Sequence, residues 1–163
     1  MDSGCTKQGE SIYFRCRKAA ASSNPAVSSR EKTAELLGIS TSTLANYELG
    51  VTKFVPVDII VRMADLFNAP ELKHAYCAQE CPIGRGQPIA VEITSIERIA
   101  LRLLKTMDDD SIRSFRDSLV DVALKGEPNE NERIVYEALI ERIDEIMVVL
   151  SELRMLAEKT LKG

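Results

Sequence analysis

Apolar residues along this chain recur at steps of three and four positions, and alternating runs of β-branched residues are nearly absent. Such spacing places apolar side chains on one face of an α-helix, so the expected fold class is all-α. In the first half of the chain the pattern predicts helices over about 10–21, 30–37, 41–49, 56–67 and 71–79. Ser29 and either Ser40 or Thr41 stand where helix N-caps are needed, and Gly38 stands where a left-handed residue can end a helix.

The segment from Cys81 to Pro88 is the clearest boundary in the chain. It holds two prolines and two glycines within eight residues, and such a segment cannot continue a helix. We therefore expect one helical domain over 1–81, a linker over 82–93 and a second helical domain over 94–163. In the second domain, Thr94 or Ser95 can cap a helix, the Asp108–Ser111 segment starts the next, and Gly126–Asn129 forms a turn.

From Asn131 to Leu161, a stretch of about 30 residues, nothing in the sequence interrupts a helix. Seven apolar residues step through it by three or four, the spacing of a coiled-coil seam: Tyr136, Leu139, Ile143, Ile146, Leu150, Leu153 and Ala157. A helix of this length would be about 45 Å long. Because two shorter helices cannot cover so long an apolar face, we expect the chain to form a homodimer through these C-terminal helices.

Composition narrows the class of protein. Hydrophobic residues make up 45% of the 163 residues and charged residues 28%, as is usual for a globular protein. The formal net charge is −4, but residues 1–90 carry 10 Lys and Arg against 9 Asp and Glu, whereas residues 91–163 carry 11 against 16. No apolar stretch approaches the ~20 residues of a membrane span and no secretory signal is visible, so we expect a cytoplasmic protein without a membrane partner.

The run from Ser29 to Gly50 places its special residues where a helix-turn-helix needs them. Ala34 is small where two helices would cross, Gly38 provides the turn, and Leu44 and Tyr47 supply a buried face for the second helix. At these residues the chain resembles the phage-repressor-like helix-turn-helix family, also called the Cro and repressor type or xenobiotic-response-element family. The resemblance covers roughly residues 12–72.

That resemblance implies a bundle of about five helices that binds operator DNA, usually as a dimer. It also implies that the helix over 41–49 enters the major groove of double-stranded DNA. The family pattern then assigns base contacts to Thr41, Ser42 and Asn46, and phosphate contacts suit Arg30, Lys32, Thr43 and Lys53. Two positions depart from the pattern, since Arg30 stands where many members have Gln and Thr33 stands where an aliphatic residue is common.

The cysteines and the single histidine give weak support to a metal site. His74, Cys77 and Cys81 are spaced to share one helix face, and zinc could bind there with Cys5 or Cys16 as a fourth ligand. The spacing is not the paired C-x-x-C of zinc ribbons, so plain packing of free cysteines is preferred over a metal site or a redox switch. We expect no metal and no cofactor. With one histidine and no phosphate-binding loop, no catalytic constellation is present, so we do not expect an enzyme.

Two functions remain on the sequence alone. The first is a sequence-specific transcriptional regulator with an N-terminal DNA-binding domain and a C-terminal dimerisation bundle. The second is an adaptor or assembly protein that uses its acidic C-terminal bundle to bind another protein. The salt dependence of DNA binding separates them, because contacts to phosphates release counterions.

Overall fold

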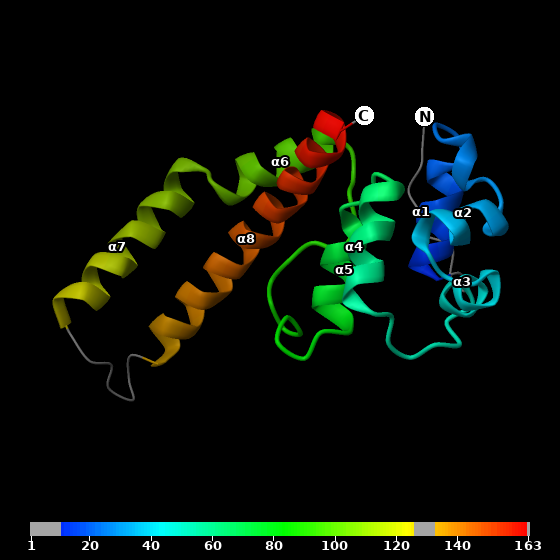
Figure 1. Ribbon diagram of the computed structural model, residues 1–163. Helices are drawn as coiled ribbons and strands as arrows, with labels where there is room; N and C mark the ends of the chain where they lie inside the picture. The colour runs from blue at the N-terminus through cyan, green and yellow to red at the C-terminus, as the bar shows by residue number, and fades with distance from the viewer. Residues whose placement is uncertain (1–10, 126–132, 163) are drawn as a thin grey trace. The chain divides into compact units, whose positions relative to one another are not determined.

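The structure is a computed structural model that describes residues 11–125 and 133–162 (Figure 1). These residues form eight α-helices and one short 3₁₀ helix, with no strand among them, which confirms the all-α fold class. The helices are α1 (Ile12–Ala20), η1 (Pro25–Val27), α2 (Arg30–Leu37), α3 (Thr41–Glu48), α4 (Val57–Leu66), α5 (Glu71–Gln79), α6 (Ile96–Thr106), α7 (Asp109–Lys125) and α8 (Arg133–Lys162). The expected turn over 126–129 lies outside the described residues.

Local sequence chemistry explains where α2 and α3 begin and end. The Ser29 side chain accepts a hydrogen bond from the Lys32 amide at 3.3 Å and caps α2. Gly38 ends α2 with a φ of 68°, a left-handed conformation that costs a residue without a Cβ little. Ser40 then caps α3 by accepting from the Thr43 amide at 3.0 Å. Ser40 rather than Thr41 is therefore the cap, and a turn of three residues joins the two helices.

The chain divides into two compact units, each described here by itself. The first unit comprises the described residues of Met1–Gln87, Val91–Ile93 and Met155–Gly163. One continuous core lies inside it, with side chains from α1 to α5, η1 and the loops between them. The largest fully buried side chains of that core are Leu37, Leu44, Ile60, Met63 and Leu72. The expected aliphatic position at Thr33 is also fully buried, and its hydroxyl donates to the Ser29 carbonyl at 2.7 Å, so the polar group is satisfied.

The last two turns of α8 belong to the first unit and not to the second. Met155 is fully buried, Lys159 Nζ lies 2.7 Å from Glu71 Oε1, and Lys162 Nζ lies 2.9 Å from Asp65 Oδ1. The Asn68 amide donates to the Lys159 carbonyl at 3.0 Å. The expected domain boundaries assigned residues 155–163 to the C-terminal domain, and these contacts explain why they group with α4 and α5 instead.

The second unit comprises Pro88–Ala90 and the described residues of Thr94–Arg154, which carry α6, α7 and most of α8. Its centre is the buried carboxylate of Glu152, which accepts from the Thr94 amide at 2.8 Å and the Thr94 hydroxyl at 2.6 Å and also pairs with Arg102. Among the described residues of this unit, the buried apolar side chains are only Ala90, Ile99, Leu139 and Val149. The unit is held by a polar junction and a small apolar centre.

The seven residues predicted to form a dimer seam on α8 fall into two groups. Leu139 is buried within the chain, and Tyr136, Ile146 and Leu153 are half-buried. Ile143 is 40% exposed, Leu150 is 45% exposed, and Ala157 is exposed as well. In Figure 1, α8 is a single unbroken helix. None of the described helices combines the length and the apolar character needed to cross a bilayer.

Candidate nucleic-acid interface

Helix α3 presents a polar face outward and an apolar face inward. Leu44 is fully buried and Tyr47 is 7% exposed, and both anchor the helix in the core of the first unit. Ser42 and Asn46 are exposed and lie one turn apart, about half a turn around the helix from Leu44. The side-chain amide of Asn46 takes part in no hydrogen bond between described residues. This face carries a donor and an acceptor that no other part of the described chain satisfies.

The hydroxyls at the start of α3 form a small cluster. Ser40 Oγ lies 2.9 Å from Ser42 Oγ and 2.7 Å from Thr43 Oγ1. Thr41 and Ser42 are exposed, whereas Thr43 is half-buried. Each hydroxyl has both a donor and an acceptor function, so the cluster orders the side chains and leaves capacity for a further partner.

A buried carboxylate fixes the end of α3. Glu48 has a fully buried side chain, pairs with Arg17 through Nε, and accepts from Arg17 Nη2 at 3.1 Å and Arg30 Nε at 2.6 Å. Arg17 also donates to the carbonyls of Val27 and Ser28, both at 3.2 Å. These bonds join α1, α3, the segment before α2 and the first residue of α2. They therefore hold the two helices of the turn at a fixed angle.

The sequence did not reveal this junction. Arginine side chains are mostly exposed in proteins, but the side chain of Arg17 is only 3% exposed. Arg17 follows the buried Tyr13 by four residues, and Glu48 follows the buried Leu44 by four. A charged residue one turn from a core residue on the same helix face was the available signal.

Positive charge gathers where α1 meets the start of α2. The cationic groups of Arg17, Lys18 and Arg30 lie 5.7, 5.7 and 5.9 Å from the ring centre of Phe14. Arg17 and Arg30 share the single carboxylate of Glu48, and Lys18 adds a third positive charge beside the ring, so these groups together are net positive. The predicted phosphate contact Arg30 keeps 37% of its side chain exposed while its Nε is held by the carboxylate.

The two lysines predicted to contact phosphates lie on either side of α3 in the sequence and are both exposed. Lys32 is in the first turn of α2, next to Arg30. Lys53 lies in the loop after α3, with its Nζ 5.4 Å from the ring centre of Phe54, which is itself 58% exposed. The loop therefore offers an exposed cation within cation–π distance of an exposed aromatic ring.

The weak metal candidates do not assemble into a site in the described part of the chain. His74, Cys77 and Cys81 are half-buried, the two cysteines are free thiols, and Cys16 is buried in the core. No group of three or more His, Cys, Asp or Glu residues among the described positions is arranged to hold a metal ion. Cys5 lies outside the described residues.

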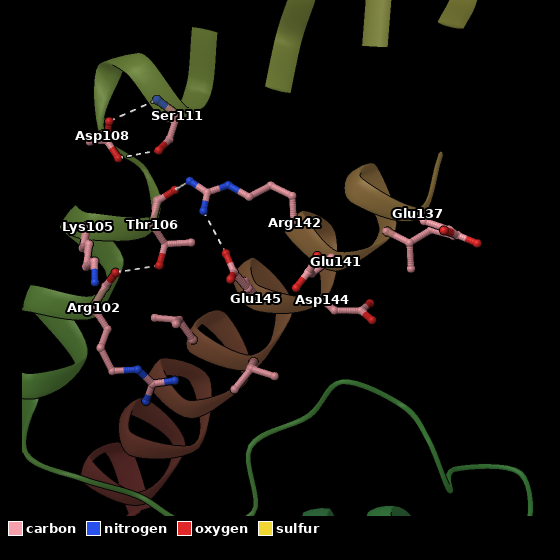
Figure 2. Close-up of a pocket in the computed structure, with 13 residues that line it drawn as sticks. Arg102, Lys105, Thr106, Asp108, Ser111, Glu137, Glu141, Arg142, Asp144 and Glu145 are labelled. Carbon is pink, nitrogen blue, oxygen red and sulfur yellow. Dashed lines mark hydrogen bonds and ion pairs between the residues drawn. The ribbon is translucent and has the colours of Figure 1, made fainter. Parts of the chain in front are cut away.

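The second unit contains an open groove of about 910 Å³ between α8 and the junction of α6 with α7. Figure 2 shows Arg142 reaching from α8 to Glu145 and to the backbone carbonyl of Thr106. Acidic side chains of α8 dominate the lining: Glu137, Glu141, Asp144 and Glu145. Carboxylates outnumber the cations Arg102, Lys105 and Arg142 in this lining, so the groove is acidic.

The candidate interface has three parts: an outward polar face on α3, cations at the start of α2 and in the loop after α3, and a buried ionic junction that joins α1, α2 and α3. Its positions on α3 are those that the sequence marked for base contacts. No protein-family model, curated protein or solved structure matches this chain in the comparisons made with each.

Proposed function

We propose that this protein is a sequence-specific DNA-binding transcriptional regulator of the repressor-like helix-turn-helix kind, which binds operator DNA as a dimer. The observation that carries the proposal is the outward face of α3, where the exposed Asn46 and Ser42 have free hydrogen-bonding capacity while the opposite face is clamped in the core. It acts in the cytoplasm, needs no cofactor and performs no catalysis.

Helix α3 (Thr41–Glu48) can enter the major groove, because an α-helix with its side chains is about 10–12 Å across and the groove is about 12 Å wide. Thr41, Ser42 and Asn46 are the base-contacting residues in this proposal. The amide of Asn46 can pair in bidentate fashion with adenine, and the short side chains of Thr41 and Ser42 suit the thymine methyl group.

Phosphate contacts fix the register of α3 on the duplex. Arg30, Lys32, Thr43 and Lys53 make these contacts in the proposal. Arg30 is ordered in advance by the Glu48 carboxylate, which reduces the conformational entropy lost on binding. The N-terminal half of the chain is only slightly basic, so backbone amides and helix N-termini must supply part of the attraction.

Dimerisation through α8 completes the proposal. A single small module rarely gives both tight and selective binding, and a symmetric dimer contacts two half-sites. The α8 seam over residues 136–157 provides the self-association surface, since Ile143 and Leu150 remain exposed in one chain.

The test is selection of bound sites from random double-stranded DNA, followed by gel shifts with the recovered site. Asn46→Ala should lower specific affinity by about 1–3 kcal/mol and relax the preference at one base pair. Lys53→Ala should weaken specific and random DNA alike and make the salt dependence shallower. Glu35→Ala, on the exposed surface of α2, is the matched control. An unchanged ratio of operator to random affinity in Asn46→Ala removes this residue from the reading face.

The acidic groove in Figure 2 favours a second candidate, an adaptor whose C-terminal unit binds a basic partner protein. DNA binding would then be absent or independent of sequence. A regulator shows a sequence-dependent affinity whose logarithm falls steeply with the logarithm of salt concentration, and an adaptor does not.

A further inference from the structure

The three cations around Phe14 differ in how many of their hydrogen-bond donors are engaged. Arg17 is buried, and all three of its nitrogens donate, to the Glu48 carboxylate and to two backbone carbonyls. In the described part of the chain Arg30 donates through Nε alone, and 37% of its side chain is exposed. Lys18 is exposed and has no ion pair with a carboxylate of the described residues. Donors for a further acceptor therefore remain on Arg30 and Lys18.

The formal charge of this cluster is not balanced. Two arginines share the carboxylate of Glu48, and Lys18 adds a third positive charge, which leaves a formal charge of +2. Glu31 and Lys32, the next residues of α2, are exposed and opposite in charge, so they do not alter this balance. Like charges held near one another repel, and an anion bound between them relieves the repulsion. The cluster is therefore suited to an anionic ligand.

The cluster lies against the end of the proposed DNA-reading helix. Glu48 is the last residue of α3, and its Oε2 accepts from Arg30 Nε at 2.6 Å. The cationic groups of Arg30 and Lys18 lie 5.9 and 5.7 Å from the same ring centre, that of Phe14. A helix with its side chains nearly fills the width of the major groove, so the phosphates that border the groove pass close to the flanks of the helix. A cation cluster joined to α3 is thus near the DNA backbone.

We propose that Lys18 contacts a backbone phosphate of the DNA and thereby extends the interface from α2 and α3 onto α1. This rests on the DNA binding of the proposed function and adds a contact that the sequence did not assign. The ligand is a phosphodiester group, so the contact strengthens binding without reading a base. Lys18 acts beside Arg30, whose terminal nitrogens are open to the same stretch of backbone.

Salt titration of the full chain on the selected operator tests this contact. Each phosphate contact contributes about 0.9 to the slope of log affinity against log salt. Lys18→Ala should therefore lose about 3.5-fold less affinity than the wild type between 50 and 200 mM salt. It should also weaken operator and random DNA by the same factor. Lys18→Arg retains the charge and should keep the wild-type slope.

Lys73→Ala is the matched control for net charge. Lys73 is a cation of the same unit, but its Nζ lies 3.4 Å from Asp65 Oδ1 on another part of the surface, on α4 and α5. Its removal changes the charge of the protein as much as Lys18→Ala does and should leave the salt slope unchanged. Circular dichroism of both variants checks that the helices are retained, as expected for an exposed side chain such as Lys18.

Neutral phosphates in the operator locate the contact. A methylphosphonate replaces one charged phosphate oxygen by a methyl group, and it can be placed at one backbone position at a time. At one position this replacement should weaken binding of the wild type and leave Lys18→Ala unaffected, because the variant has no charge to lose there. If every position weakens both proteins by the same factor, Lys18 contacts no phosphate and the proposal is overturned.

The outcomes separate this contact from the proposed function. An unchanged salt slope in Lys18→Ala overturns the contact, while a relaxed specificity of Asn46→Ala leaves the DNA-binding function in place. An altered base preference in Lys18→Ala assigns the residue to a base and also overturns the phosphate contact. A wild-type protein whose affinity depends on neither salt nor sequence overturns both the contact and the function.

Discussion

The two units of this chain differ in how many of their apolar side chains are buried. The first unit buries eighteen apolar side chains among its described residues and leaves eight large ones exposed. The second buries four and leaves thirteen large ones exposed. In the first unit, several short helices cross one another and enclose a core. In the second unit, the longer helices pack along their lengths, so few side chains are enclosed on all sides.

Each unit contains one buried glutamate paired with arginine, which makes the comparison direct. Glu48 is held by Arg17, whose side chain is 3% exposed, and by Arg30. Glu152 is held by Arg102, whose side chain is 45% exposed, and by Thr94. The Arg17–Glu48 pair of the first junction is buried on both sides, whereas the arginine of the second junction is 45% exposed, so the energetic consequences of breaking them should differ.

The largest expected effect is that of Glu48→Ala. It should lower the free energy of unfolding of the first unit by about 3–5 kcal/mol, because it leaves the Arg17 charge buried without its carboxylate. Glu152→Ala should cost about 1–3 kcal/mol, because water can solvate Arg102. Urea unfolding with native-state hydrogen exchange assigns each loss to its unit. Equal losses of unfolding free energy in Glu48→Ala and Glu152→Ala would show that the exposure of the paired arginine does not set the size of the loss.

The second prediction concerns the boundary between the units. Met155→Ala should destabilise the first unit by about 2–5 kcal/mol, since its fully buried side chain leaves a cavity. Met147→Ala, eight residues earlier on the same helix and 40% exposed, should change the stability of that unit by less than about 0.5 kcal/mol. Hydrogen exchange in α4 and α5 is the measurement. If protection there is the same in both variants, the end of α8 does not stabilise the first unit.

Dilution should change the stability of the second unit and leave that of the first unchanged. If a second copy covers the second unit, each tenfold dilution removes about 1.4 kcal/mol of its stability by mass action, while the first unit is unaffected. Thermal unfolding followed by circular dichroism over a hundredfold range of concentration should then show one midpoint that moves and one that does not. A second unit with a concentration-independent midpoint is stable without a partner.

The smallest expected effect is electrostatic. A hydrogen bond from Lys162 and the charge of Lys73 lower the pKa of Asp65 below its ordinary value. A carboxyl with a lowered pKa in the folded state contributes stability that is present above its unfolded value of about 3.9 and is lost as the pH falls through the folded pKa. Lys162→Met should return the pKa of Asp65 toward its ordinary value in an NMR titration.

Glu97 in the second unit is the control for this titration. A hydrogen bond from Ser95 lowers its pKa, and this bond does not involve Lys162. Its titration should be the same in both proteins. A parallel change in Glu97 and Asp65 would point to a global loss of structure rather than to a lost ion pair.

Much of the candidate site could be located from the sequence because its signals are local. The caps at Ser29 and Ser40, the left-handed Gly38 and the buried Leu44 follow from residues within one or two helical turns. The Glu48 junction could not be located in this way, because Arg17 and Glu48 are 31 residues apart and their pairing depends on how three helices cross.

The sequence by itself determined the helices, their limits and which residues face outward on α3, since each depends on periodicity and on capping within a few residues. Only the tertiary structure decided that the end of α8 joins the first unit, that Arg17 is buried, and which side of α8 stays exposed. These outcomes depend on which apolar stripe meets which neighbour. Helical periodicity predicts the apolar stripes of α8, and the contacts with other elements decide which stripe stays exposed.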